Sequence, residues 1–289
     1  MAITKTLKVI GRTKRETLLE NLIRKQKKFR EVVTIPEMKK RINTKYRQYR
    51  INSKKIILQT ENMLSILSKE PTLRNAEFVF LDRDALPYMH IARELCKEYG
   101  FNKEQFKPML ITREAENHID TKLHNIITPK EYVALRSNST ELKTIGHKLP
   151  LTPTTENLKL WIKRNIDLKK PIVVIDSGYN GTSVKRIQFL LADISPGIKS
   201  YSAMFYATEF AKSNIDYFLG DKSADGIETI EGVPKFNGKL LEINKNGRIK
   251  REKETKTSTR APSQPANAEI FMIALRNQLA RYKKEKGIL

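Results

Sequence analysis

The seven residues from Ser177 to Ser183 carry the side chains best suited to hold a ligand in this chain. They read Ser-Gly-Tyr-Asn-Gly-Thr-Ser and lie between an apolar run and a helical pattern. The glycines and the asparagine allow a sharp turn, and a helix that begins there adds free N–H groups and partial positive charge. Because these features suit an anion, we predict a phosphate-binding loop; an ordinary strand-to-helix turn is the alternative. Its expected members are Gly178, Tyr179, Asn180, Gly181, Thr182 and Ser183.

Two apolar runs must position this loop and a second, charged turn. Ile172–Asp176 is short, rich in β-branched residues and ends in a carboxylate, which predicts a buried strand. Glu77–Leu81 is a similar run, and Asp82-Arg83-Asp84 follows it directly. In parallel sheets, ligands collect outside the carboxyl ends of the strands. The loop and the charged turn would therefore face one crevice if these two strands are neighbours.

The alternation of strand and helix patterns predicts an α/β fold, with a parallel sheet and flanking helices, over residues 72–220. Residues 1–71 have the pattern of a basic helical region, with one helix opening near Thr34 and another from Lys54 to Ser68. Residues 221–289 predict a β-hairpin, a linker and a basic terminal helix. Within the core, further strands are expected at 107–112 and 199–208, and helices at 155–166 and 209–219.

Ile172 to Ser183 resembles the ribose-5-phosphate loop of type I phosphoribosyltransferases, in which an apolar strand ends in an acid and a Gly/Thr cradle opens a helix. Phe78 to Leu95 resembles that family's earlier strand, pyrophosphate-side loop and helix, and the polar stretch 114–151 is similar to its flap. The two segments are also similar to the phosphoribosyltransferase-like domains of bacterial polysaccharide-biosynthesis proteins. The resemblance implies a phosphoribosyltransferase-like parallel sheet, a phosphoribosyl pyrophosphate substrate and Mg²⁺.

The resemblance also implies a role for each polar group. Residues 181–183 would hold the 5′-phosphate, Asp176 would take the ribose hydroxyls, and Arg83 and Asp84 would face the pyrophosphate. The family has two adjacent acids where Asp176 stands alone, and Thr or Ser where Tyr179 stands. The missing second acid favours binding over catalysis.

We therefore expect a protein that binds a phosphoribosyl or nucleotide phosphate in its core. An active phosphoribosyltransferase acting on an unidentified base is the alternative, and a structural nucleic-acid-associated protein is a further one. No tightly bound organic cofactor is expected. The sequence leaves the oligomeric state open, a homodimer included.

The net charge of +23 is concentrated at the two ends of the chain. Residues 1–70 hold 19 Lys/Arg and 6 Asp/Glu, and residues 241–289 hold 12 and 5. Basic ends around a near-neutral body predict polyanion binding, most commonly to RNA or DNA, with a solvated lysine-rich surface as the alternative. Two tyrosines here either stack on bases or pack on the body. The candidate contacts are Arg24, Lys28, Tyr46, Arg47, Tyr49 and Arg50.

The composition excludes several classes of protein. No apolar stretch reaches the roughly 18 residues needed to cross a bilayer, so no membrane partner is expected. The first 30 residues contain no apolar region of a signal peptide. The single cysteine, Cys96, excludes a disulfide framework and fits a reducing, cytoplasmic compartment. No metal-ligand spacing is present among the four histidines.

Overall fold

The computed structural model describes residues 35–81, 85–109, 153–179, 181–207, 212, 215–220, 240–243, 249–251 and 264–288. The chain divides into two compact units. The helical unit contains the described residues up to Thr60 together with 264–288, and the sheet unit contains those from Glu61 to Gly220 together with 240–251. The segments 1–71 and 221–289 expected from the sequence therefore each contribute to both units.

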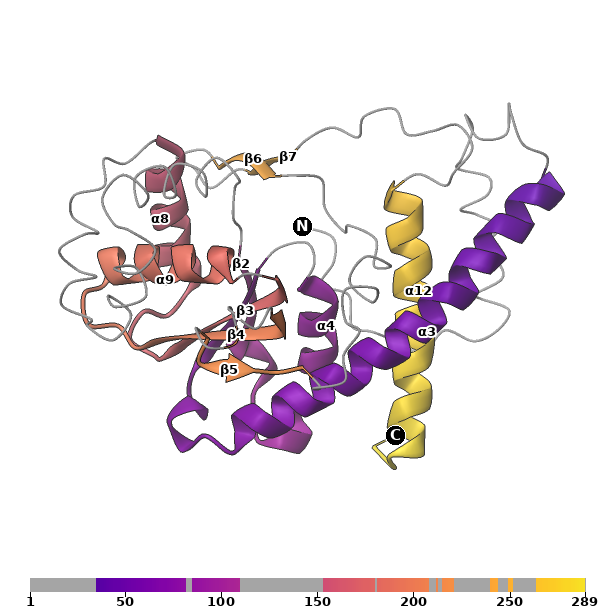
Figure 1. The fold of residues 1–289 in the computed structure, drawn as a ribbon, viewed down its shortest axis with the longest axis horizontal. Helices are drawn as coiled ribbons and strands as arrows, with labels where there is room; N and C mark the ends of the chain where they lie inside the picture. The colour runs from indigo at the N-terminus through magenta and orange to yellow at the C-terminus, as the bar shows by residue number, and fades with distance from the viewer. Residues whose placement is uncertain are drawn as a thin grey trace. The chain divides into compact units, whose positions relative to one another are not determined.

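One sheet of five parallel strands forms the centre of the sheet unit (Figure 1). This confirms the predicted α/β class with a parallel sheet and flanking helices. Every residue of β1 is buried, as expected for a central strand covered on both faces. The strands are β1 (Glu77–Leu81), β2 (Phe106–Met109), β3 (Ile172–Tyr179), β4 (Ser200–Ala207) and β5 (Tyr217–Phe218).

In the strand order β2-β1-β3-β4-β5, the direction in which successive strands are added to the sheet changes once. The chain passes from β1 to β2 on one side and then returns to place β3 on the other side of β1. The register pairs Glu77 with Ile172 and Phe80 with Ile175. The reversal therefore lies between β1 and β3, where the two crossovers diverge and leave room above the carboxyl ends.

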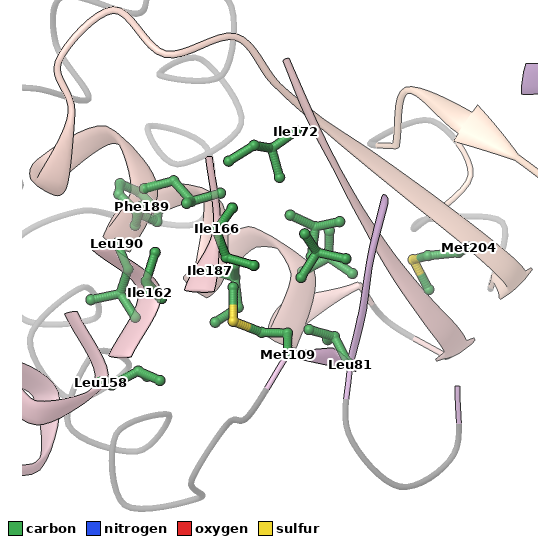
Figure 2. Close-up of a cluster of buried hydrophobic side chains, with 14 residues drawn as sticks. Leu81, Met109, Leu158, Ile162, Ile166, Ile172, Ile187, Phe189, Leu190 and Met204 are labelled. Atoms are coloured by element: carbon green, nitrogen blue, oxygen red, sulfur yellow. The ribbon is translucent and has the colours of Figure 1, made fainter. Parts of the chain in front are cut away.

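Helices α8 (Pro153–Asn165) and α9 (Thr182–Ile194) cover one face of the sheet (Figure 1). Their apolar residues pack with those of β1, β3 and β4, as Figure 2 shows. Lys159 of α8 forms an ion pair with Asp193 of α9, which ties the two helices together. This buried cluster, which also includes Met109 of β2, consists of Val79, Leu81, Met109, Leu158, Ile162, Ile166, Ile172, Val174, Val184, Ile187, Phe189, Leu190, Leu191 and Met204.

The opposite face carries an aromatic core covered by α4 (Leu86–Leu95). Tyr88 of α4 stacks on Phe205 with ring centroids 3.8 Å apart, and Phe78 stacks on Phe106 at 4.9 Å. Strand alternation sends Phe78 to this face and Val79 to the α8–α9 face. Three short 3₁₀ turns complete the connections, η1 (Pro71–Leu73), η2 (Cys96–Tyr99) and η3 (Lys103–Gln105). Cys96 is buried, as expected for a core residue.

Two boundaries differ from those predicted. β3 continues to Tyr179, because Gly178 pairs with Tyr206 and Tyr179 pairs with Ala207 of β4. The helix expected over 209–219 is wrong at its end, where Tyr217–Phe218 forms β5. Asp216 fixes this strand: its carboxylate accepts hydrogen bonds from the backbone N–H of Ser202 at 2.7 Å and from its hydroxyl at 2.6 Å.

A long helix, α3 (Ile35–Ser68), replaces the two helices expected between Thr34 and Ser68; the helix pattern that begins at Thr13 lies outside the described residues. In the helical unit its first part packs with α12 (Gln264–Glu285). Tyr49 and Phe271 meet edge to face at 5.4 Å, and Asn277 Nδ2 donates to Tyr46 Oη at 2.9 Å.

The predicted hairpin is present as the antiparallel pair β6 (Leu240–Ile243) and β7 (Ile249–Arg251). Among the described helices, none is long and apolar enough to cross a membrane.

Candidate functional site

Three of the predicted ligand residues, Asp176, Gly181 and Ser183, lie in the last part of β3 and at the start of α9. β3 ends at Tyr179, and the loop between it and α9 is reduced to Asn180 and Gly181. Asp176 follows Ile172 and Val174 at the strand period of two, which places it on the α8–α9 face. It is half-buried and lies opposite Met204 of β4 in the register. The acid and the start of α9 thus belong to the same side of the sheet.

The backbone of Gly181 makes the abrupt transition from strand to helix. Its φ of +68° lies in the left-handed region, which favours glycine. A Cβ on this residue would lie 3.0 Å from Met204 Sδ and 3.7 Å from Ile215 Cγ2. Both the dihedral angle and the close approach of Met204 therefore require glycine here. Glycine at position 181 is thus explained by the backbone geometry without a ligand, as it would be in an ordinary strand-to-helix turn.

The N-terminus of α9 begins directly after Gly181. The N-cap residue offers no side-chain acceptor, and the first turn contains no acidic residue. The first hydrogen bond of the helix runs from the N–H of Lys185 to the carbonyl of Gly181 at 3.1 Å. The helix dipole at this end is thus not offset by a capping carboxylate, a feature that suits a bound anion. Ser183, in this first turn, is half-buried.

The structure describes the predicted ligand residues to different extents. Asp176, Gly181 and Ser183 come together around the end of β3 and the start of α9. For Gly178, Tyr179 and Thr182 the backbone alone is described, in β3 and α9. The remaining predicted residues, Arg83, Asp84 and Asn180, lie outside the described residues. Sequence reasoning missed Met204 as a neighbour of this site. The structure reveals it through its pairing with Asp176 in the register and its close approach to Gly181.

Metal ligands are sparse in the described part of the chain, where no group of three or more His, Cys, Asp or Glu side chains is arranged to hold an ion. Mg²⁺ commonly binds through one or two carboxylates together with substrate phosphates. Asp176, as a single carboxylate beside a candidate phosphate site, fits an ion held mainly by a substrate.

The candidate nucleic-acid contacts separate into buried rings and exposed cations. Tyr46 and Tyr49 are 8% and 4% exposed, so of the two alternatives for these rings the structure has the packed one. This corrects the interpretation that they stack on bases, because each ring is surrounded by its own helical unit. Arg47 is exposed and Arg50 is half-buried. Arg24 and Lys28 lie outside the described residues.

Four further cations of α3 are exposed and were not among the predicted contacts: Lys40, Arg41, Lys54 and Lys55. The signal that would have found them is charge patterning, since no Asp or Glu occurs between residues 38 and 60 while eight Lys and Arg do. The spacing of the buried residues then tells which cations face outward.

No protein-family model, curated protein or solved structure matches this chain. Its function has to be argued from the residues and their arrangement.

Proposed function

We propose that the sheet unit binds the phosphate of a phosphoribosyl group or nucleotide, at the crevice above β1 and β3. The observation that carries this proposal is the pairing of β1 with β3 as parallel neighbours at the reversal of strand order. In open parallel sheets this position collects ligands. Strand β1, which Arg83 and Asp84 follow in the sequence, is the neighbour of β3, which carries Asp176.

The start of α9 supplies the complement for the anion. Its N-terminus has neither a side-chain cap nor an acidic residue in the first turn. A phosphate there would be held by N–H groups and by the helix dipole, with Ser183 as a further donor. The resemblance of residues 172–183 to a ribose-5-phosphate loop supports a phosphosugar or nucleotide as the source of that phosphate.

An active phosphoribosyltransferase is the second candidate. Loss of pyrophosphate builds negative charge, which Arg83 and a substrate-bound Mg²⁺ would stabilise. The single acid at Asp176 favours the binding role over this one. We also propose that the basic ends bind nucleic acid, which would bring a ligand-sensing body to a polyanion. A purely structural nucleic-acid-associated protein remains the third candidate, favoured only if the crevice binds no phosphate.

The experiment replaces Ser183 by glutamate and, as a matched neutral control, by glutamine. A carboxylate in the first turn of α9 interacts favourably with the helix dipole, by about 0.3–1 kcal/mol. The same carboxylate repels a phosphate at that position. We therefore expect Ser183→Glu to melt at the wild-type temperature or slightly above it while losing affinity for phosphoribosyl pyrophosphate and nucleoside monophosphates in calorimetry. Ser183→Gln should retain most of that affinity.

The opposed changes in stability and binding make the result decisive. Equal ligand affinity in the glutamate and glutamine variants would show that the phosphate does not lie at α9, and no binding by the wild-type protein would remove the proposal. Product formation from phosphoribosyl pyrophosphate and a panel of bases, with Mg²⁺, would favour the enzyme instead.

A further inference from the structure

We infer that the nucleic acid bound by the helical unit is double-stranded, and that the exposed face of α3 binds its phosphates. The inference rests on the proposed nucleic-acid binding and specifies its partner class. Single-stranded binding proteins gain affinity and strand preference from aromatic rings on which bases stack. Tyr46 and Tyr49, the aromatic residues of this basic helix, are buried in the core of the unit. With these rings buried, the exposed cations are the groups of this helix that can bind the phosphates of a nucleic acid.

The cations of α3 form a regular column on its exposed face. Lys40, Arg47 and Lys54 recur every seven residues, and all three are exposed, as are Arg41 and Lys55. Seven residues of an α-helix rise about 10.5 Å, so the column from Lys40 to Lys54 is about 21 Å long. Over that length a duplex presents about a dozen phosphates, at one charge per roughly 1.7 Å. The described helical unit holds 13 Lys and Arg against 3 Asp and Glu.

A surface that binds through charge alone favours the polyanion with the higher charge density. Each cation seated on duplex DNA contributes about −0.9 to the slope of log affinity against log salt, whereas on a single strand it contributes about −0.7. For the five exposed cations this difference gives a duplex about ten-fold tighter than a single strand at 0.1 M salt, taking equal affinities at 1 M.

Two apolar side chains share the exposed face and define the competing interpretation. Ile51 is 64% exposed and Leu58 is 47% exposed, again seven residues apart. A protein partner, such as an acidic amphipathic helix, would use these residues as its main contacts. Charge favours nucleic acid, because the five exposed cations outnumber the two apolar residues and no carboxylate interrupts them between residues 38 and 60.

The test uses the full chain and fluorescence anisotropy with a 20-mer single strand and the matching duplex at several salt concentrations. Arg47→Ala with Lys54→Ala removes two cations of the column and keeps good helix-forming residues. We expect this variant to lower the salt slope on duplex by about two and the affinity by about 50-fold at 0.1 M salt. The matched control, Lys97→Ala with Lys169→Ala, removes two exposed charges from the sheet unit and should leave both values unchanged.

Each outcome has one meaning. Absence of salt-dependent binding to either strand form would overturn the proposed nucleic-acid binding itself. Binding in which the single strand is equal or tighter would overturn only the duplex inference. An unchanged salt slope in the Arg47/Lys54 variant would overturn the assignment to α3. If Ile51→Ser with Leu58→Ser weakens duplex binding more than the loss of two cations does, apolar contact dominates and the inference fails.

Discussion

Replacing Gly181 by alanine tests the geometry on which the candidate phosphate site depends. The substitution adds one methyl group at a φ of +68°, where a residue with a Cβ is disfavoured by about 1–2 kcal/mol. It also directs that methyl group to within 3.0 Å of Met204 Sδ. Met204 is fully buried, so its side chain has to shift by a few tenths of an ångström in a packed core, which we expect to cost about 0.5–1.5 kcal/mol more. We expect a total loss of about 1.5–3.5 kcal/mol of unfolding free energy.

Gly100 provides the matched control for the dihedral angle alone. Its φ is +76°, but a Cβ there meets nothing within 4 Å. Gly100→Ala should therefore cost only the conformational part, about 1–2 kcal/mol. Asparagine tolerates the left-handed region, so Gly100→Asn should recover most of this loss. Gly181→Asn should recover less, because its side chain still meets Met204.

Trp161 supplies the assay. It is the single tryptophan of the chain, and its side chain packs against the cluster between the sheet, α8 and α9. Its fluorescence in urea therefore reports the unfolding of the sheet unit. If Gly181→Ala costs no more than Gly100→Ala, then Met204 does not lie beneath Gly181, and the described start of α9 is wrong.

Three other changes test the packing of each unit. Burial raises the pKa of Tyr49 to about 12. The contribution of its neutral phenol to the unfolding free energy is therefore complete below pH 10 and is lost as the pH rises from 10 to 12. In urea unfolding followed by circular dichroism, Tyr49→Phe should lose less unfolding free energy over this range than the wild-type protein does. Glu77→Gln should lower the unfolding free energy by roughly 1–3 kcal/mol, since it removes a buried carboxylate 2.6 Å from Lys107 Nζ; an unchanged urea midpoint would contradict this pairing. A double-mutant cycle of Tyr46→Phe and Asn277→Ala should give a coupling of about 0.5–1.5 kcal/mol for their hydrogen bond, and additive losses would argue against the contact.

The sheet was predictable because its strands are covered on both faces. Glu77–Leu81 and Ile172–Asp176 are continuous apolar runs, and this pattern holds for central parallel strands whatever their neighbours are. The order of the strands was not predictable in the same way, because no local pattern states which run lies beside which. The sequence therefore did not predict that β1 and β3 are neighbours, although the candidate site depends on it.

The ends of strands depend on pairing partners rather than on local pattern. Ser177, Gly178 and Tyr179 have the composition of a turn, yet β4 extends far enough to pair with them through Tyr206 and Ala207. Tyr217 and Phe218 were expected in a helix, because the local pattern does not show that β4 pairs with them. Their apolar side chains fit either structure, and the hydrogen bonds of Asp216 with Ser202 decide for the strand.

The long helix α3 shows how one spacing decides both the core and the charged surface. Most of the buried residues of this helix alternate at four and three residues, the 3.5-residue period of a seam that packs against other elements, and Ile57 and Leu64 are buried beside that seam. Ser53 and Thr60 are the polar residues of this seam, and Ser53 lies just before Lys54, where the second of the two expected helices was to begin. Each donates its hydroxyl to the carbonyl four residues earlier, at 2.6 and 2.7 Å, so neither is left unsatisfied. The seam consists of Ile42, Tyr46, Tyr49, Ser53, Ile56, Thr60, Met63 and Leu67.

The same period fixes the exposure of the cations. Lys40, Arg47 and Lys54 share the seven-residue repeat but lie on the opposite side of the helix from Tyr46 and Tyr49. Rotating α3 to present the rings to bases would carry these cations into the apolar core. Burying unpaired charges costs far more than base stacking returns, which is about 1–3 kcal/mol per base. The burial of the rings and the exposure of the cations therefore follow from the same spacing, and this arrangement is the reason why we propose a duplex bound through its phosphates.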